Sequence, residues 1–187
     1  MKLPDATTIK LPDTVYILAP GANADPRKLP LQSCCIGVNA GAIVTDWSCD
    51  YWLVADRHCP QMYWWPDDKP CTCIFGFAHD WADYTFLQSP ALGGSQGPGC
   101  IEGVLRCNGT VVGQAIQLCY WAGVKRCILN GVDMYGDHYY DGSKIYNGRK
   151  VWRYIDHLNP LIDWIHRNSK MRVTTQTKTE LSIENHA

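Results

Sequence analysis

The segment GVDMYGDHYYDG, residues 131 to 142, gathers most of the side chains in this sequence that could do chemistry. It directly follows an apolar run, and its candidate reactive residues are Asp133, Tyr135, His138, Tyr139 and Tyr140. Tyrosine hydroxyls can hydrogen-bond a departing phosphate, and carboxylates can hold Mg²⁺. Alternatively, Asp133 caps a turn while the tyrosines pack against the core. The residues alone leave both interpretations open.

Small and polar residues also follow three other apolar runs, Gly21 and Asn23 after the first, Asn39 after the second and Asp56 after the third. In an open parallel sheet the carboxyl ends of the strands line the crevice where ligands bind. Glycine lets a backbone approach a phosphate, and asparagine can donate to and accept from a base or a ribose. Any one of these could be an ordinary turn residue. Their joint placement favours a nucleotide site.

Two common phosphate-binding fingerprints are missing from the sequence. The turn after the first apolar run reads PGAN rather than GxGxxG, and no GxxxxGK[ST] segment is present. Both NAD-dependent dehydrogenases and P-loop kinases are therefore disfavoured.

Two further clusters have a structural and a functional interpretation. A zinc site could be assembled from His58, Cys59, Cys71, Cys73 and His79. However, the spacing of its cysteines is CxC rather than the CxxC of common zinc knuckles, and residues two apart on a strand share one face, as core residues do. We therefore expect no zinc there. The YWWP cluster at residues 63 to 66 could stack on a sugar or a heterocycle, or could anchor a loop against the sheet.

The elements that must position these residues are short strands and two helices. Four apolar runs, at residues 14–19, 34–38, 50–56 and 71–78, are too continuous to have one wet face, which is typical of parallel strands covered on both sides. A helix is predicted over 110–123, from the capping residue Thr110 to Gly123, and a strand over 124–133 follows it. A second amphipathic helix is predicted from Lys150 to Arg167 with a break or kink at Pro160, before a last strand near 171–177.

We therefore expect a single α/β domain over residues 1–187, a Rossmann-like three-layer α/β/α fold with a mostly parallel central sheet. Residues 88 to 109 contain six glycines and two prolines, so a flexible lid or hairpin is expected at 88–108.

The 17 basic and 18 acidic residues nearly cancel, so a nucleic-acid partner is not expected. The first residues lack the continuous apolar region of a secretion signal, and no run approaches the roughly 20 apolar residues of a membrane span. We expect a cytoplasmic protein whose ten cysteines are mostly reduced and buried, and which could form a homo-oligomer.

The pattern resembles two related groups, the hydroxymethylpterin diphosphokinase-like family and the bacterial lipooligosaccharide sialyltransferases. The matching segments are ILAPGAN, IGVNAG, DYWLVAD, the long GTVVGQAIQLCYWAGVKRCILNGVDMY, and the closing TQTKTEL. The match is strong over residues 14 to 56 and 109 to 135. It departs from the sialyltransferases at the turn after the first strand, which lacks their serine, and at Arg153, where they place a histidine base.

The resemblance implies roles for particular residues. By this resemblance, the nucleotide would be contacted by Gly21, Asn23 and Asn39. Gly109 and Thr110 would lie at a helix N-terminus near the phosphate or the ribose. Tyr135 with Tyr139 or Tyr140 would steady the leaving phosphate. His138 or His157 remains as the general base, since an ordinary histidine pKa suits proton removal near neutral pH.

We therefore expect a nucleotide-dependent transferase, in first place a sialyltransferase-like glycosyltransferase that uses a nucleotide-sugar donor, for example a CMP-linked one, and a small-molecule or glycan acceptor. The alternatives are a Mg-dependent diphosphokinase of the hydroxymethylpterin type, with Asp56 and Asp133 holding Mg²⁺, and a non-catalytic domain that binds a nucleotide or a glycan.

Overall fold

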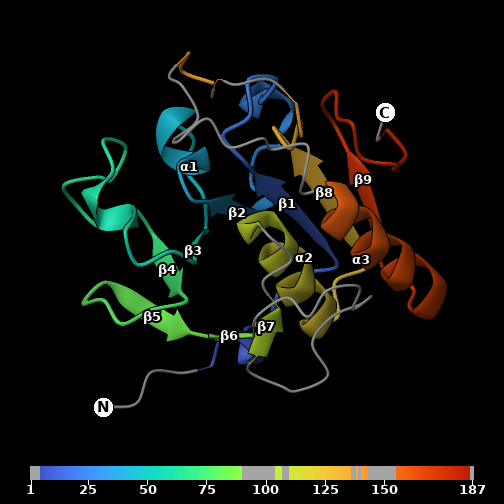
Figure 1. The fold of residues 1–187 in the computed structure, drawn as a ribbon, viewed down its shortest axis with the longest axis horizontal. Coiled ribbons are helices and arrows are strands. Elements are labelled where there is room, and N and C mark those ends of the chain that lie inside the picture. Colours follow the sequence, from blue (N-terminus) through green and yellow to red (C-terminus); the bar gives the residue numbers. More distant parts are fainter. Residues whose placement is uncertain are drawn as a thin grey trace.

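The protein has an α/β fold built on one central parallel sheet, shown in Figure 1. The computed structural model describes residues 5–89, 104–106, 110–135, 138, 140–142 and 155–185. The strands lie in the order β5-β4-β3-β2-β1-β8-β9, and every neighbouring pair is parallel. Their bounds are β1 Thr14–Leu18, β2 Cys34–Val38, β3 Tyr51–Val54, β4 Thr72–Phe75, β5 Ala82–Thr85, β8 Arg126–Asn130 and β9 Arg172–Thr175. The Rossmann-like architecture with a mostly parallel sheet is therefore confirmed.

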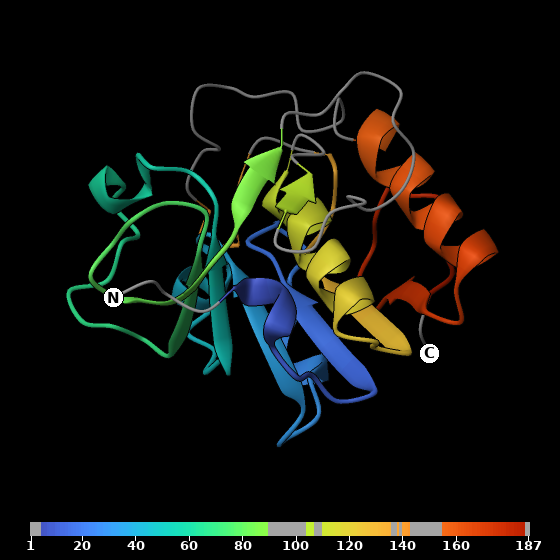
Figure 2. The same ribbon diagram turned by 90° about the horizontal axis from the view of Figure 1, so that it is seen from below.

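The strands are apolar throughout because both faces of the sheet are covered. On β1, Val15 and Ile17 belong to the cluster beneath helices α2 and α3, whereas Tyr16 and Leu18 belong to a cluster on the other face. That second face is covered by the one-turn helix α1 (Gly41–Val44) and by loops. Figure 2 shows α2 and α3 side by side on their shared face. The sheet is thus the middle of three layers.

Helix α2 (Val111–Trp121) begins and ends where the capping residues predict. The Thr110 hydroxyl accepts the N–H of Val112 at 3.3 Å. At the other end Gly123 has a φ of +76°, the left-handed conformation that terminates helices and that glycine adopts without strain. Since α2 leads directly into β8, the two run in opposite directions, and the N-terminus of α2 faces the carboxyl edge of the sheet.

Helix α3 (Ile155–Asn168) continues through Pro160, so no break in the helix accompanies this proline. Its buried residues recur at helical spacing and pack toward β9: they are Leu158, Leu161, Ile162 and Ile165. The Val173 N–H of β9 donates to His166 Nε2 at 2.9 Å, and burial lowers the pKa of this imidazole. His166 is therefore a structural acceptor that joins α3 to β9.

The glycine-rich segment between the sheet and α2 has strands at its two ends. β6 (Leu87–Ser89) and β7 (Val104–Arg106) form a separate two-stranded sheet and pair in parallel. A hairpin would pair its strands antiparallel, so the described ends of the expected 88–108 unit do not form one. Residues 90–103 and 107–109 lie outside the described residues.

The strand order reverses between β1 and β8, because the chain fills one side of β1 with β2 to β5 and then returns to its other side. In open parallel sheets such a switch point leaves a crevice at the carboxyl edge. No helix among the described residues is long and apolar enough to cross a membrane.

Candidate functional site

The turns after β1 and β8 meet at the switch point through glycines. Gly21 N–H donates to the Gly131 carbonyl at 2.9 Å. A Cβ atom on Gly21 would lie 2.2 Å from that carbonyl oxygen, and one on Gly131 would lie 2.3 Å from the carbonyl oxygen of Ala19. Gly131 also has a φ of +72°. Only glycine fits at these two positions, so the close approach predicted for Gly21 is to the protein's own backbone.

Asn23, Asp133 and Tyr135 are joined by hydrogen bonds across the switch point. The backbone N–H of Asn23 donates to Asp133 Oδ2 at 2.8 Å, and Asn23 Nδ2 donates to the Tyr135 hydroxyl. The structure therefore brings together Gly21, Asn23, Asp133 and Tyr135, four of the residues predicted from the strand ends.

Asp133 is a buried carboxylate with one oxygen unused. The residue is 3% exposed, and among the described residues Asp133 Oδ1 has no hydrogen-bond partner. Burial raises the pKa of Asp133, although the hydrogen bonds from Asn23 act in the opposite direction. A buried acceptor without a donor costs free energy, so this oxygen is suited to a ligand N–H or O–H.

Tyr135 and Lys178 form the donor side of the same site. Burial first, and then the charges of Asp133 and Glu180, raise the pKa of Tyr135, so the phenol keeps its proton at neutral pH. Lys178 Nζ lies 5.3 Å from the centre of the Tyr135 ring. Lys178 is not among the site residues predicted from the sequence, although it lies in the TQTKTEL segment.

The segment after β9 holds the β8 turn in place from outside. Gly131 N–H donates to Thr177 Oγ1 at 3.0 Å, and Glu180 N–H donates to the Asp133 carbonyl at 3.0 Å. The Thr179 hydroxyl donates to the Val132 carbonyl. These contacts place Lys178 beside Tyr135.

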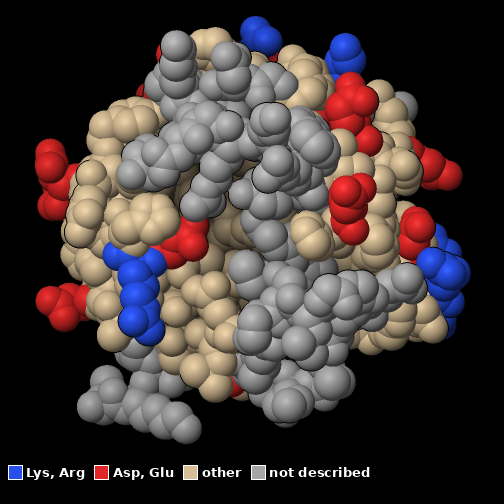
Figure 3. Space-filling view, in the orientation of Figure 1, with Lys and Arg blue, Asp and Glu red and all other residues tan. Residues whose placement is uncertain are grey.

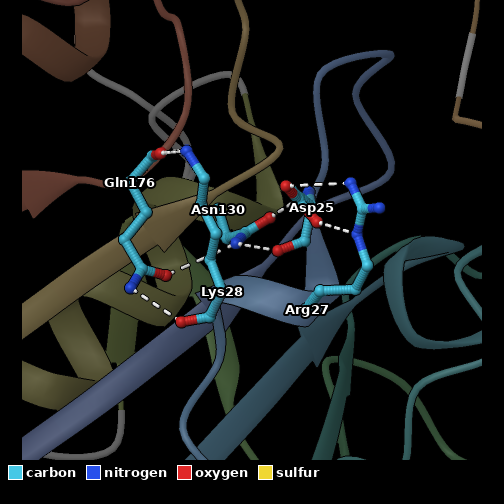
Figure 4. A network of polar contacts seen from close by, with 5 residues as sticks. All are labelled: Asp25, Arg27, Lys28, Asn130 and Gln176. Atoms are coloured by element: carbon cyan, nitrogen blue, oxygen red, sulfur yellow. Dashed lines mark hydrogen bonds and ion pairs between the residues drawn. The ribbon is translucent and has the colours of Figure 1, made fainter.

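A network of polar contacts between the loop after β1 and the ends of β8 and β9 holds this loop in place (Figure 4). Asn130, the fully buried last residue of β8, accepts the Asp25 N–H at 2.8 Å and donates to the Asp25 carbonyl at 2.9 Å. Gln176 bonds with Lys28 in both directions, through its carbonyl at 2.9 Å and its side-chain amide at 3.0 Å. The loop that carries Gly21 and Asn23 is thus tied to β8 and to the end of β9.

Asn39 lies at the end of β2, beside β1. Its φ is +45°, its N–H donates to the Leu53 carbonyl, and its carbonyl accepts Trp52 Nε1 at 2.7 Å. Asn39 Oδ1 is buried and, within the described part of the chain, has no partner. It is a second unused acceptor at the carboxyl edge.

The loop after β8 extends across this edge of the sheet. The Tyr140 N–H donates to the Pro20 carbonyl at 2.8 Å, and the Tyr63 hydroxyl donates to Asp141 Oδ2 at 3.4 Å. Residues 140 to 142 thus link the turn after β1 with the loop between β3 and β4. The Tyr140 side chain is 43% exposed.

No family model, curated protein or solved structure matches this chain. The geometry described above, together with the remaining predicted residues, is therefore the basis for a functional assignment.

The other predicted residues take less definite positions. Thr110 uses its hydroxyl to cap α2, and half-buried Asp56, two residues beyond β3, accepts the Cys59 N–H through its carbonyl. His138 is exposed, and His157 is exposed in the first turn of α3. Gly109 and Tyr139 lie outside the described residues.

The tryptophan cluster packs as a loop anchor. Trp64 is 6% exposed and meets Trp52 edge-on at 6.4 Å, while Trp65 tilts over Trp52 at 4.8 Å. Tyr63, by contrast, is 61% exposed. In the described residues no group of three or more histidine, cysteine, aspartate or glutamate side chains could hold a metal ion.

Charged residues are dispersed on the face that Figure 3 shows, where described lysines and arginines are interspersed with acidic residues. This pattern matches the near-zero net charge of −1. On this face the described residues form no broad basic patch.

Proposed function

We propose that this protein is a nucleotide-dependent transferase, specifically a sialyltransferase-like glycosyltransferase that uses a nucleotide-sugar donor such as a CMP-linked sugar. The observation that carries the proposal is the buried Asp133 carboxylate, which has one unused oxygen at the β1/β8 switch point. This is where open parallel sheets bind nucleotides.

In this proposal the two unused acceptors hold the nucleoside. Asp133 Oδ1 and Asn39 Oδ1 lie at the ends of β8 and β2, on either side of β1. Ribose hydroxyls and exocyclic amines of bases are the donors that a nucleoside offers to such oxygens. The Asp133 carboxylate offers only acceptors, which favours the nucleoside over the phosphate as its partner, whereas the Asn39 amide carries both an acceptor and a donor.

The phosphate is assigned to the donors on the other side of Tyr135. The Tyr135 hydroxyl accepts from Asn23 and is therefore free to direct its own proton outward. Lys178 adds a positive charge near this ring. Together they would stabilise the negative charge that grows on a departing phosphate, with Tyr139 or Tyr140 assisting and the N-terminus of α2 near Thr110 as a further anion site.

The acceptor is a small molecule or a glycan, and its hydroxyl is deprotonated by His138 or His157 in this proposal. We also propose that the protein acts in the cytoplasm, since the eight cysteines of the described residues are free thiols, the state that a reducing compartment maintains.

A Mg-dependent diphosphokinase is the second candidate, and one observation favours it. Mg²⁺ is usually held by one or two carboxylates together with substrate phosphates, so the unused oxygen of Asp133 would serve as a protein ligand. Asp56, the second ligand expected from the sequence, follows β3, three strand spacings or about 14 Å from β8, and is not placed to share that ion. A non-catalytic domain that binds a nucleotide or a glycan would need only the acceptors.

The test is a thermal-shift screen with CMP, UDP, GDP, ATP and NAD, each with and without Mg²⁺, because a ligand that binds only the folded state raises the Tm. We expect a Mg-independent shift with a nucleotide. A shift only with ATP and Mg²⁺ favours the diphosphokinase, and binding without donor hydrolysis or transfer favours the non-catalytic domain. No shift with any nucleotide contradicts the proposal.

A further inference from the structure

Gln114 is a buried polar side chain that neither the predicted site nor the proposed function uses. It is the fourth residue of α2, in the part of this helix that faces the carboxyl edge, and it is 1% exposed. Glutamine seldom occupies such a position unless both ends of its amide are hydrogen-bonded.

The orientation of the Gln114 amide follows from its neighbours. Gln88 Nε2 donates to the Ala55 carbonyl and lies 3.5 Å from the Gly76 carbonyl oxygen, so two carbonyls fix which end of Gln88 is the nitrogen. Gln88 Oε1 then accepts from Gln114 Nε2 at 3.4 Å. A flipped Gln114 would set two oxygens against each other. The hydrogen bonds therefore run from Gln114 Nε2 to Gln88 Oε1 and from Gln88 Nε2 to the Ala55 carbonyl, and Gln114 Oε1 is the open end of this amide chain.

This open end has no donor among the described residues. Gln117, one turn later on the same helix and fully buried, differs in that its Nε2 donates to the Gly113 carbonyl at 3.0 Å. Of these two buried glutamines on one helix, only Gln114 has a side-chain oxygen without a hydrogen-bond donor in the described part of the chain. Such a buried acceptor costs free energy, so it persists only where something compensates that cost.

The amide chain lies away from the Asp133 site. Ala55 follows β3 and Gly76 follows β4, whereas Asp133 follows β8. The β3/β4 boundary and the β1/β8 boundary are three strand spacings apart, about 14 Å. A ligand group at Gln114 is therefore separate from one at Asp133, while Asn39, at the end of β2, lies nearer, about one and a half spacings or ~7 Å from the β3/β4 boundary.

We propose that Gln88 and Gln114 form a second subsite, which binds the acceptor substrate through a hydroxyl or amine that donates to Gln114 Oε1. This inference rests on the proposed function, because a transferase needs a second substrate. A glycan or small-molecule acceptor carries several O–H or N–H groups, so one of them can donate to Gln114 Oε1 while another is the nucleophile. An anionic group without a proton is excluded at this point, since an amide oxygen offers it no donor.

The test compares Gln114→Met with Gln117→Met, the same substitution at a matched buried position. In the ligand-free protein Gln114→Met is expected to leave the Tm unchanged or higher, because it removes an unsatisfied acceptor. Gln117→Met should lower the Tm by several degrees, at roughly 2 to 4 °C for each kcal/mol lost. The probes are methyl glucoside, methyl galactoside and ethanolamine, and their binding is measured by saturation-transfer NMR with and without CMP. The glycosides offer only hydroxyl donors, whereas ethanolamine offers both a hydroxyl and an amine.

The inference predicts that at least one probe binds the wild type and Gln117→Met, and binds Gln114→Met about tenfold more weakly or worse, as expected for one lost hydrogen bond. It is overturned if no probe binds, if Gln114→Met binds like the wild type, or if it loses as much Tm as Gln117→Met, which would mean that water or protein already satisfies the oxygen. A failed nucleotide screen with intact probe binding would overturn the proposed function, and with it the acceptor role, but would leave Gln114 as a binding site for a hydroxyl or an amine.

Discussion

The Asp133 carboxylate accepts the backbone N–H of Asn23 at 2.8 Å and so joins the turn after β8 to the turn after β1. One oxygen of a buried carboxylate is thereby hydrogen-bonded within the fold, and the other has no hydrogen-bond partner among the described residues. The free energy that burying this carboxylate costs the ligand-free protein can be measured.

Replacing Asp133 with Asn should make the stability difference between variant and wild type depend on pH. Burial raises the pKa of Asp133 in the folded protein, so the folded state binds the proton more readily than the unfolded state. The contribution of this carboxyl to stability is therefore lost as pH rises above about 4, the ordinary pKa of aspartate, whereas Asp133→Asn lacks this contribution. Thermal unfolding of both proteins at a series of pH values above this one should show the variant gaining relative to the wild type as pH rises. A constant difference, or one of opposite sign, would contradict the burial cost.

Gly131→Ala and Gly123→Ala separate backbone strain from crowding at the switch point. Both glycines have positive φ values, 72° and 76°, but a Cβ on Gly123 would meet nothing within 4 Å, whereas one on Gly131 would meet the Ala19 carbonyl. We expect Gly123→Ala to cost about 1 to 2 kcal/mol and Gly131→Ala about 3 kcal/mol or more in urea unfolding. Equal losses would show that the two turns are not in close contact.

Asn130→Ala should destabilise the loop after β1 because it leaves the N–H and carbonyl of Asp25 without their partner. The expected loss is about 2 to 4 kcal/mol in the free energy of unfolding. Arg27→Ala is the control, since it removes only an ion pair on the exposed side of the same loop and should change stability little. Similar effects of the two substitutions would argue against the buried network.

Tyr135→Phe should slow the transfer or hydrolysis of the donor that gives the largest thermal shift. Loss of one hydroxyl aimed at a developing negative charge lowers kcat by about 10²-fold or more, while nucleotide affinity changes less. Tyr84→Phe on β5, at the opposite edge of the sheet from β8 and β9, is the control and should retain full activity. An unchanged kcat in Tyr135→Phe would remove Tyr135 from the mechanism.

Much of the fold could be predicted because the central strands are continuous apolar runs. The range predicted for β2, residues 34–38, matches the structure in full, and the predictions for β1 and β8 contain the observed strands. β5 was missed because only Ala82 of its ADYT sequence is buried, so this edge strand leaves no apolar run. Whether a strand could be predicted from the sequence therefore depended on how many of its residues are buried, rather than on its strand propensity.

The site was partly predictable for a related reason. Residues that follow parallel strands gather at one edge, which is enough to bring Asn23, Asp133 and Tyr135 together. Lys178 reaches Tyr135 only because the segment after β9 folds back along the β8 turn, a contact between distant parts of the chain. Gln114 looks like an ordinary polar helix residue until the layer above it is known.

The central claim is that a nucleotide binds at the β1/β8 switch point. The most direct measurement is an amide NMR titration of the ¹⁵N-labelled protein with the nucleotide that stabilises it most. The account predicts that the largest shifts fall on Gly21, Asn23, Gly131 and Asp133, with little change at Tyr84 on β5. Shifts concentrated on β4 and β5, or no shifts at saturating nucleotide, would contradict it.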